Sequence, residues 1–202
     1  MQVEIVHRFF NSLIQPVQEV ILDIGQNFMY LDIKCNSNYD CIDQYLDLMV
    51  FLMTSLQSHD KFVRFNRVAI RKIDGDDYAS LDDAYDIFLS RRFAHDDEFA
   101  HLQRWTSKYV GEEQFKTEND VITNLKRCVE VMGDEEFRFS LDIDTYIDSR
   151  VYNFTNIVEA SEIKYILYER LNKTSFSIFR EFVTDGFLTD GVNNYKRMHG
   201  EI

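Results

Sequence analysis

The pattern of apolar and polar residues predicts a β-hairpin over residues 17–35. Two segments of strand-like composition, 19–24 and 28–34, flank a short stretch, Gly25-Gln-Asn27. Gly and Asn tolerate the backbone conformations that short hairpin turns require, and the flanking segments are rich in β-branched and aromatic residues. The hairpin makes its two strands antiparallel neighbours in the sheet that they join.

A helix is predicted directly after this hairpin, over residues 39–58. Asn36-Ser-Asn38 supplies side chains that can cap the N-terminus of a helix. Apolar residues then recur at spacings of three and four, which places them on one helix face. These residues are Tyr39, Ile42, Leu46, Met49, Val50, Met53 and Leu56.

The middle of the chain returns to strand-like composition at residues 62–73. This segment is followed by Asp74-Gly-Asp-Asp77, whose Gly and Asp residues are typical of a turn. Short helices are then predicted near 81–89 and 96–103, and a strand over 105–110 follows them.

The second half of the chain repeats the order of the first. Residues 121–132 and 136–144 are expected to form another hairpin, and an amphipathic helix is predicted over 159–183. One interpretation of this order is a ββα pseudo-repeat. Because hairpins pair their strands antiparallel, the expected fold is a single α+β domain over 1–202, with a mostly antiparallel sheet and helices packed on one face.

Composition narrows the choice of partner. The chain has 202 residues and a formal net charge of −13, so its field repels phosphate backbones. This weighs against nucleic acid or an anionic membrane as the main partner and favours a basic protein. Cys35, Cys41 and Cys128 form no CxxC pair and are interpreted as reduced thiols. The N-terminal residues do not resemble a signal peptide and no stretch approaches ~18 apolar residues, so a cytoplasmic protein is expected.

Fixed positive charge is concentrated in the third predicted strand segment, which contains Arg64, Arg67 and Arg71. By the period of a strand, Arg67 and Arg71 share one face, and Asp142 and Asp144 share a face of a later strand. If the two strands are neighbours, the guanidinium groups can meet the carboxylates in charge-assisted bonds. One interpretation is a structural ladder of ion pairs. The other is a ligand-binding site of these five residues, in which Arg67 and Arg71 hold a carboxylate or a phosphate.

The segment Asn66-Arg-Val-Ala-Ile-Arg-Lys-Ile-Asp74 resembles the Arg-Ile-Gly-Leu-Arg-Tyr-Ile-Asn strand of a sporadically distributed, uncharacterised bacterial family. Members of that family also carry a late Asp-Ile-Asp strand followed by a helix. Arg67 and Arg71 match the two arginines, and Asp142-Ile-Asp144 matches the late acidic strand, whereas Lys72 stands in place of the aromatic residue. The resemblance implies a bacterial or mobile-element setting and carries no known activity.

Signals of enzymatic activity are weak. Asp142 and Asp144 have the spacing of paired carboxylates that hold a divalent cation, but the arginines expected nearby would compete with a metal. His59-Asp60 and His95-Asp96 lack the further ligands of a phosphohydrolase metal site. The chain contains no Gly-rich phosphate loop and no nucleophile elbow. We therefore predict no catalytic residue, no metal site and no cofactor.

Aromatic and acidic residues favour a protein-binding role instead. Phe182 and Phe187 lie near the end of the last predicted helix, and Asp76 and Asp77 lie in the turn predicted after the arginine-rich strand. An exposed aromatic patch marks an interaction surface, and an acidic edge steers a basic partner. These four residues are the candidate partner-binding set, and a homodimer is an alternative use of the same surface.

The leading hypothesis is a non-enzymatic protein-interaction module of bacterial or phage origin. Its size and acidic composition are those of antitoxins, immunity proteins and inhibitors of bacterial defence. The first alternative is an anion- or nucleotide-sensing domain that uses Arg67 and Arg71. The second is a metal-dependent hydrolase that uses Asp142 and Asp144.

Overall fold

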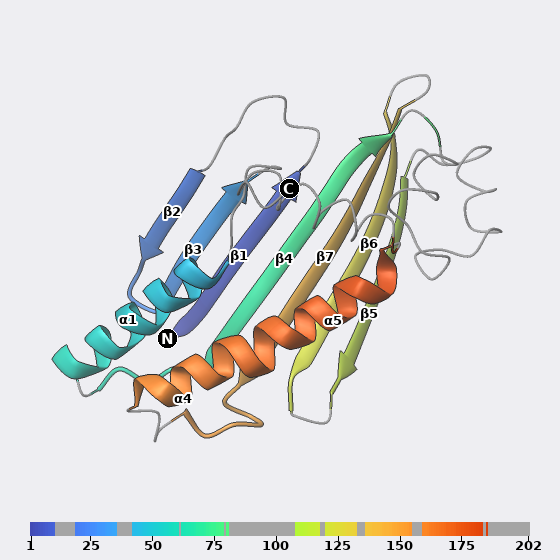
Figure 1. Cartoon of the computed structure of the whole chain (residues 1–202). Helices are drawn as coiled ribbons and strands as arrows, with labels where there is room; N and C mark the ends of the chain where they lie inside the picture. Colours follow the sequence, from blue (N-terminus) through green and yellow to red (C-terminus); the bar gives the residue numbers. More distant parts are fainter. Residues whose placement is uncertain are drawn as a thin grey trace, which may run out of the picture.

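In the computed structural model, seven strands form one sheet in the order β2-β3-β1-β4-β7-β6-β5 (Figure 1). The structure describes residues 1–10, 19–35, 42–60, 62–78, 80, 108–117, 120–132, 136–154, 159–183 and 185. The strands are β1 (Gln2–Phe10), β2 (Glu19–Ile24), β3 (Phe28–Cys35), β4 (Arg67–Tyr78), β5 (Lys108–Lys116), β6 (Ile122–Met132) and β7 (Glu136–Asp148).

Both predicted hairpins are confirmed. Strands β2 and β3 pair antiparallel, as do β6 and β7. In the first hairpin, the N–H of Gly25 donates a hydrogen bond of 2.9 Å to the carbonyl oxygen of Phe28. A Cβ atom on Gly25 would lie 2.3 Å from a ring atom of the exposed Phe28 side chain, so a larger residue at this position would displace that ring.

The prediction of a mostly antiparallel sheet is wrong, because β1 lies between β3 and β4 and runs parallel to both. The sheet is therefore mixed. No strand was predicted over residues 2–10, although Val3, Ile5 and Val6 make this segment rich in β-branched residues. Strand β3 leads to β4 through a helix, a crossover that returns the chain in the same direction.

The helices lie on one face of the sheet (Figure 1). The first is α1 (Asp43–His59), which confirms most of the helix predicted over 39–58. The second is continuous through α4 (Ala160–Lys164), a π-helical segment η2 (Tyr165–Asn172) and α5 (Lys173–Phe182), as predicted over 159–183. Within the described parts of the chain, no helix has the length and apolar character needed to span a membrane.

The core lies between the helices and the sheet in two clusters. The larger one joins α1, α4 and η2 to the central strands and includes Ile5, Leu31 and Met49. The smaller one joins α5 to β6 and β7 and includes Phe139 and Ile178. Each fully buried aliphatic or aromatic side chain contributes roughly 1.5–3 kcal/mol to stability, so these clusters hold the helices in place.

Strand β4 differs from its prediction at both ends. It begins at Arg67 rather than at residue 62, and it continues through Asp74-Gly-Asp-Asp77, which was predicted as a turn. All 12 residues of β4 pair with β7, and this long ladder outweighs the local preference of Gly and Asp for turns. The helices predicted near 81–89 and 96–103 lie outside the described residues, and the ββα pseudo-repeat stays a prediction.

Candidate functional site

Arg67 and Arg71 are bound by the two aspartates that the sequence pattern paired with them. Arg67 Nη2 donates to Asp144 Oδ1 at 2.7 Å. Arg71 donates from Nε and Nη2 to the two carboxylate oxygens of Asp142, at 2.8 and 2.6 Å. Strands β4 and β7 are antiparallel neighbours, so each ion pair links adjacent strands. The predicted ladder is confirmed as a set of contacts.

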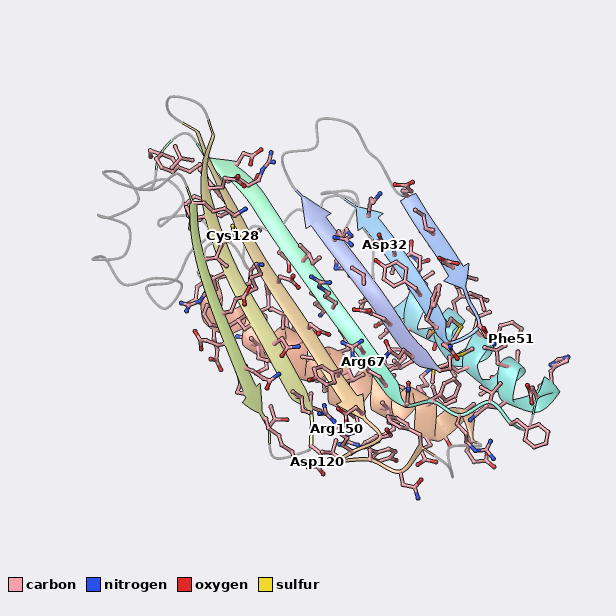
Figure 2. All side chains as sticks on the ribbon, turned by 180° about the vertical axis from the view of Figure 1, so that it is seen from behind. Asp32, Phe51, Arg67, Asp120, Cys128 and Arg150 are labelled. Carbon is pink, nitrogen blue, oxygen red and sulfur yellow. The ribbon has the colours of Figure 1, made fainter. Side chains whose placement is uncertain are left out.

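These pairs lie on the face of the sheet turned away from the helices, which we call the open face (Figure 2). Arg67 and Arg71 alternate along β4 with Val68 and Ile70, which are buried in the core against the helices. Another ion pair, from Arg8 Nε to Asp32 Oδ1 at 3.0 Å, lies on the same face between β1 and β3. Cross-strand ion pairs thus tie the open face together along much of the sheet.

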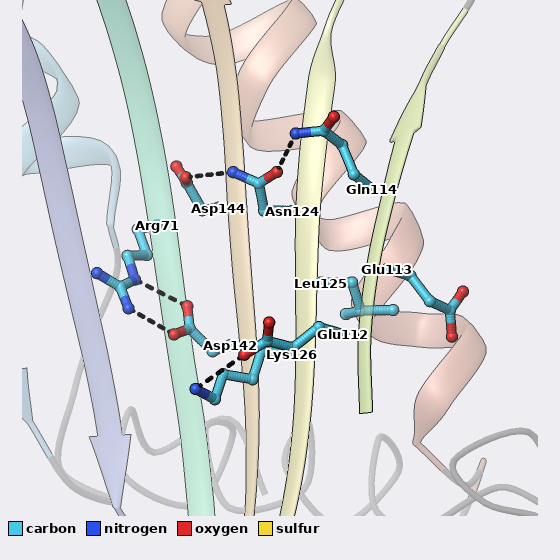
Figure 3. Close-up of a pocket in the computed structure, with 9 residues that line it drawn as sticks. All are labelled: Arg71, Glu112, Glu113, Gln114, Asn124, Leu125, Lys126, Asp142 and Asp144. Carbon is cyan, nitrogen blue, oxygen red and sulfur yellow. Dashed lines mark hydrogen bonds and ion pairs between the residues drawn. The ribbon is translucent and has the colours of Figure 1, made fainter. Parts of the chain in front are cut away.

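The open face also contains a polar depression of about 440 Å³ that reaches from β4 to β5 (Figure 3). Asn124 donates to Asp144 at 3.1 Å, and Gln114 donates to the side-chain oxygen of Asn124 at 2.7 Å. Lys126 Nζ lies 3.1 Å from Glu112 Oε1. The polar groups of this depression are therefore bound mainly to one another across four strands.

The electrostatics favour a structural role for the ladder. Hydrogen bonding to Asp142 raises the pKa of Arg71 above its already high ordinary value. Burial raises the pKa of Glu4, and Arg67, 3.7 Å away, opposes that shift. Since the guanidinium groups already hold carboxylates, an incoming anion would have to displace one. This arrangement favours the ion-pair ladder over the anion-binding interpretation.

The metal-hydrolase alternative gains no support from these contacts. Asp142 and Asp144 both accept hydrogen bonds from arginines, whose positive charge opposes a cation at the same oxygens. In the residue ranges that the structure describes, no group of three or more His, Cys, Asp or Glu side chains is arranged to hold a metal.

The remaining predicted residues are dispersed. Arg64 lies before β4, is exposed and donates to the carbonyl oxygen of Val63, so it is not part of the ladder. Phe182 is only 4% exposed and belongs to the smaller core cluster, so its side chain packs inside the protein instead of on a partner surface. Asp77 is held by Arg138 at 2.8 Å, and the carboxylate of Asp76 accepts the Asp77 N–H. Phe187 lies outside the described residues.

Sequence reasoning missed the most apolar exposed surface of the described chain, which is the edge strand β2. All six residues of β2 are exposed. Val20, Ile21, Leu22 and Ile24 are each 42–49% exposed, which is high for large apolar side chains in a strand. On α1, which covers the sheet near this edge, Phe51 is 64% exposed (Figure 2). The available signal was a strand of four apolar residues without Lys, Arg or Pro.

It also missed a buried charged cluster on the helix-covered face, formed by His7, Lys72 and Asp74. His7 and Lys72 are register partners on β1 and β4. The signal was present in the alternation of β4, which places Lys72 on the same face as Val68 and Ile70.

Comparison with known proteins adds no relative. No protein-family model matches the chain, and searches of curated proteins and of solved structures found no significant similarity. The resemblance to an uncharacterised bacterial family therefore stays a prediction, and function has to be inferred from the residues themselves.

Proposed function

We propose that this protein is a non-enzymatic interaction module that binds an extended segment of a basic partner protein by strand addition at β2. The observation that supports this most directly is the exposure of all six residues of β2 together with the apolar composition of the strand. β2 is the terminal strand of the sheet that the structure describes, so no described strand lies beside one row of its backbone N–H and C=O groups. A partner strand would satisfy these groups and cover the apolar side chains.

The opposite edge of the sheet, strand β5, differs from β2 in its number of charged side chains. Strand β5 carries four charged side chains, and each forms an ion pair. They are Lys108 with Glu130, Glu112 with Lys126, Glu113 with Arg127 and Lys116 with Asp120. Charged side chains on an edge oppose pairing with another chain. β2 carries only two charges, Glu19, which forms an ion pair with Lys34 of β3 at 2.8 Å, and Asp23.

The charge of β2 supports a basic partner. Both ionisable side chains on the strand are acidic, and the whole chain carries a net charge of −13. A second copy of this chain would bring equal negative charge to the edge, whereas a basic strand would be attracted to it. Apolar residues point to both faces of β2, so the partner segment also needs apolar residues.

Peptide binding tests the proposal. The probe is a fluorescent seven-residue peptide that alternates valine or isoleucine with lysine, and its binding is measured by fluorescence anisotropy. We expect binding that weakens as salt is added, because charge attraction contributes to it. Leu22→Lys on β2 should weaken binding at least ~10-fold, since it places a charge in the apolar edge.

Val110→Lys on β5 is the matched control, because Val110 is 41% exposed and Leu22 is 43% exposed. Both substitutions change the net charge equally, so their effects on peptide binding should differ only if the peptide binds at β2. Equal effects of the two substitutions, or equal binding of a peptide with glutamate in place of lysine, would contradict the proposal. A concentration-dependent dimer that Leu22→Lys dissociates would assign the edge to a second copy of the chain.

A further inference from the structure

A cavity of about 230 Å³ lies between the sheet and the helices, remote from the open face. His7 of β1 and Lys72 and Asp74 of β4 form its polar part. Ile42, immediately before α1, and Phe176 and Phe179 of α5 form its apolar part. The cavity therefore combines ionisable groups on the sheet with hydrocarbon from the helices.

The two charged residues of this cavity are buried without binding each other. Lys72 is 9% exposed and Asp74 is 8% exposed. Among the described residues, Lys72 Nζ lies 5.5 Å from the centre of the Phe176 ring, and no hydrogen bond or ion pair joins Lys72 or Asp74 to another side chain. An ammonium and a carboxylate that are removed from water and not directly paired are costly to the fold.

Burial acts on all three ionisable groups in the direction that disfavours their charged forms. It lowers the pKa of Lys72, while the charges of Asp74 and Asp43 oppose that shift, and it raises the pKa of Asp74. Burial, assisted by Lys72, lowers the pKa of His7 to about 3, so this imidazole is neutral near neutral pH. The cavity thus offers one basic group, one acidic group and a neutral imidazole, and a ligand of matching charges would favour the charged forms of Lys72 and Asp74.

We propose that this cavity binds a small zwitterion with an apolar side chain, namely an α-amino acid of about the size of leucine. Its carboxylate would bind Lys72, its ammonium group would bind Asp74, and its side chain would lie against Phe176 and Phe179. Lys72 and Asp74 are two residues apart on β4 and line the same cavity, so one small ligand can contact both side chains.

The apolar part of the cavity and its size support the same class of ligand. Phe176 and Phe179 are stacked with their ring centres 6.4 Å apart, and Ile42 adds an aliphatic wall. The volume equals the share of bulk liquid taken by about eight water molecules. Nucleotides and most cofactors are larger than this. The inference goes beyond the interaction proposed for β2 and does not depend on it.

Calorimetric titration of the intact chain with L-leucine tests the proposal, with two analogues as controls. 4-Methylpentanoate lacks the ammonium group, and 3-methylbutylamine lacks the carboxylate. We expect leucine to bind and each analogue to bind at least ~10-fold more weakly, because each leaves one buried charge without a partner. In amide NMR spectra, leucine should shift the signals of His7, Lys72 and Asp74, and leave those of the β2 edge unchanged.

Substitutions then assign the contacts. Lys72→Met and Asp74→Asn should each weaken leucine binding ~10-fold or more. Lys126→Met is the matched control, because it removes the same charge from the open face and should leave binding unchanged. If Lys72→Met does not fold, the two analogues, titrated into the unmodified protein, still show whether both charged groups of leucine are needed for binding. Absence of leucine binding, equal binding of the analogues, or shifts confined to the open face would overturn the proposal.

Discussion

Arg71 and Lys72 are consecutive residues of β4, yet their positive charges meet opposite environments. Arg71 points to the open face, where both oxygens of Asp142 accept its hydrogen bonds. Lys72 points to the helix-covered face, where the described residues offer it an aromatic ring and the charges of two carboxylates, Asp74 and Asp43, without an ion pair. The pKa of Arg71 is accordingly raised by its partner, while that of Lys72 is lowered by burial.

This difference separates charges that stabilise the fold from charges that oppose it. On the open face, Arg67 and Arg71 each bind a carboxylate from the neighbouring strand. On the covered face, the described residues give neither Lys72 nor Asp74 a hydrogen bond or an ion pair, and such burial lowers stability unless something else binds these groups. Residues that reduce stability in this way are concentrated at functional sites. The covered face of β4 is therefore the better candidate for ligand chemistry, although the open face carries more charge.

The largest expected effect is on the open face. Arg67→Ala should lower the free energy of unfolding by about 2–4 kcal/mol, because it leaves Asp144 without its cation in a half-buried position. It also removes the contact of the Arg67 guanidinium with the Tyr146 ring, 4.6 Å from the ring centre. Urea denaturation followed by circular dichroism measures the change.

Arg67→Met is the control for this experiment, since it retains much of the packing of the side chain and removes only the charge. If both variants unfold at the same urea concentration as the unmodified protein, the ladder does not stabilise the sheet. The arginines would then be available for the anion-binding role that the sequence also allowed.

On the covered face, the buried imidazole of His7 should make the stability of the protein depend on pH. The pKa of His7 is lowered from 6.5 to about 3 in the folded state, so the unfolded chain binds more protons between these two values. Neutral His7 therefore contributes fully to the free energy of unfolding above pH 6.5, and this contribution is lost as the pH falls. Between pH 7 and pH 5 we expect a loss of about 2 kcal/mol that His7→Asn does not show.

The comparison with His7→Asn is needed because Asp74 changes the stability with pH in the direction opposite to His7. Burial raises the pKa of Asp74, so its contribution is present at low pH and is lost as the pH rises. Asp74 is retained in both proteins, and the difference between them isolates His7. Urea unfolding at both pH values measures that difference, and parallel pH profiles would show that His7 is solvated.

Local patterns predicted the parts of this fold that depend on neighbours in sequence. The hairpin turn at Gly25, the apolar face of α1 and the long last helix follow from spacing and turn chemistry within about 20 residues. The contacts of Arg67 and Arg71 with Asp144 and Asp142 were also predictable, because opposite charges of matching period attract wherever their strands meet.

Two features required long-range information. The parallel position of β1 between β3 and β4 depends on a crossover, which no local pattern specifies. Alternation along β4 indicated that Lys72 and Asp74 oppose Arg71, but not which of the two faces the helices cover. For the same reason the sequence pointed to the arginines as a site, while the cavity lies beside the lysine.

The smallest effect is expected where the same kind of pair lies nearer to solvent. Arg138 donates from Nε and Nη2 to both oxygens of Asp77, at 2.8 and 3.0 Å, on the same ladder between β4 and β7. Its side chain is 47% exposed, compared with 20% for Arg67. Arg138→Ala should therefore cost only about 0.2–1 kcal/mol in urea unfolding, and added salt should reduce that cost further. A loss as large as that of Arg67→Ala would mean that hydrogen-bond geometry, and not burial, determines the strength of the ladder.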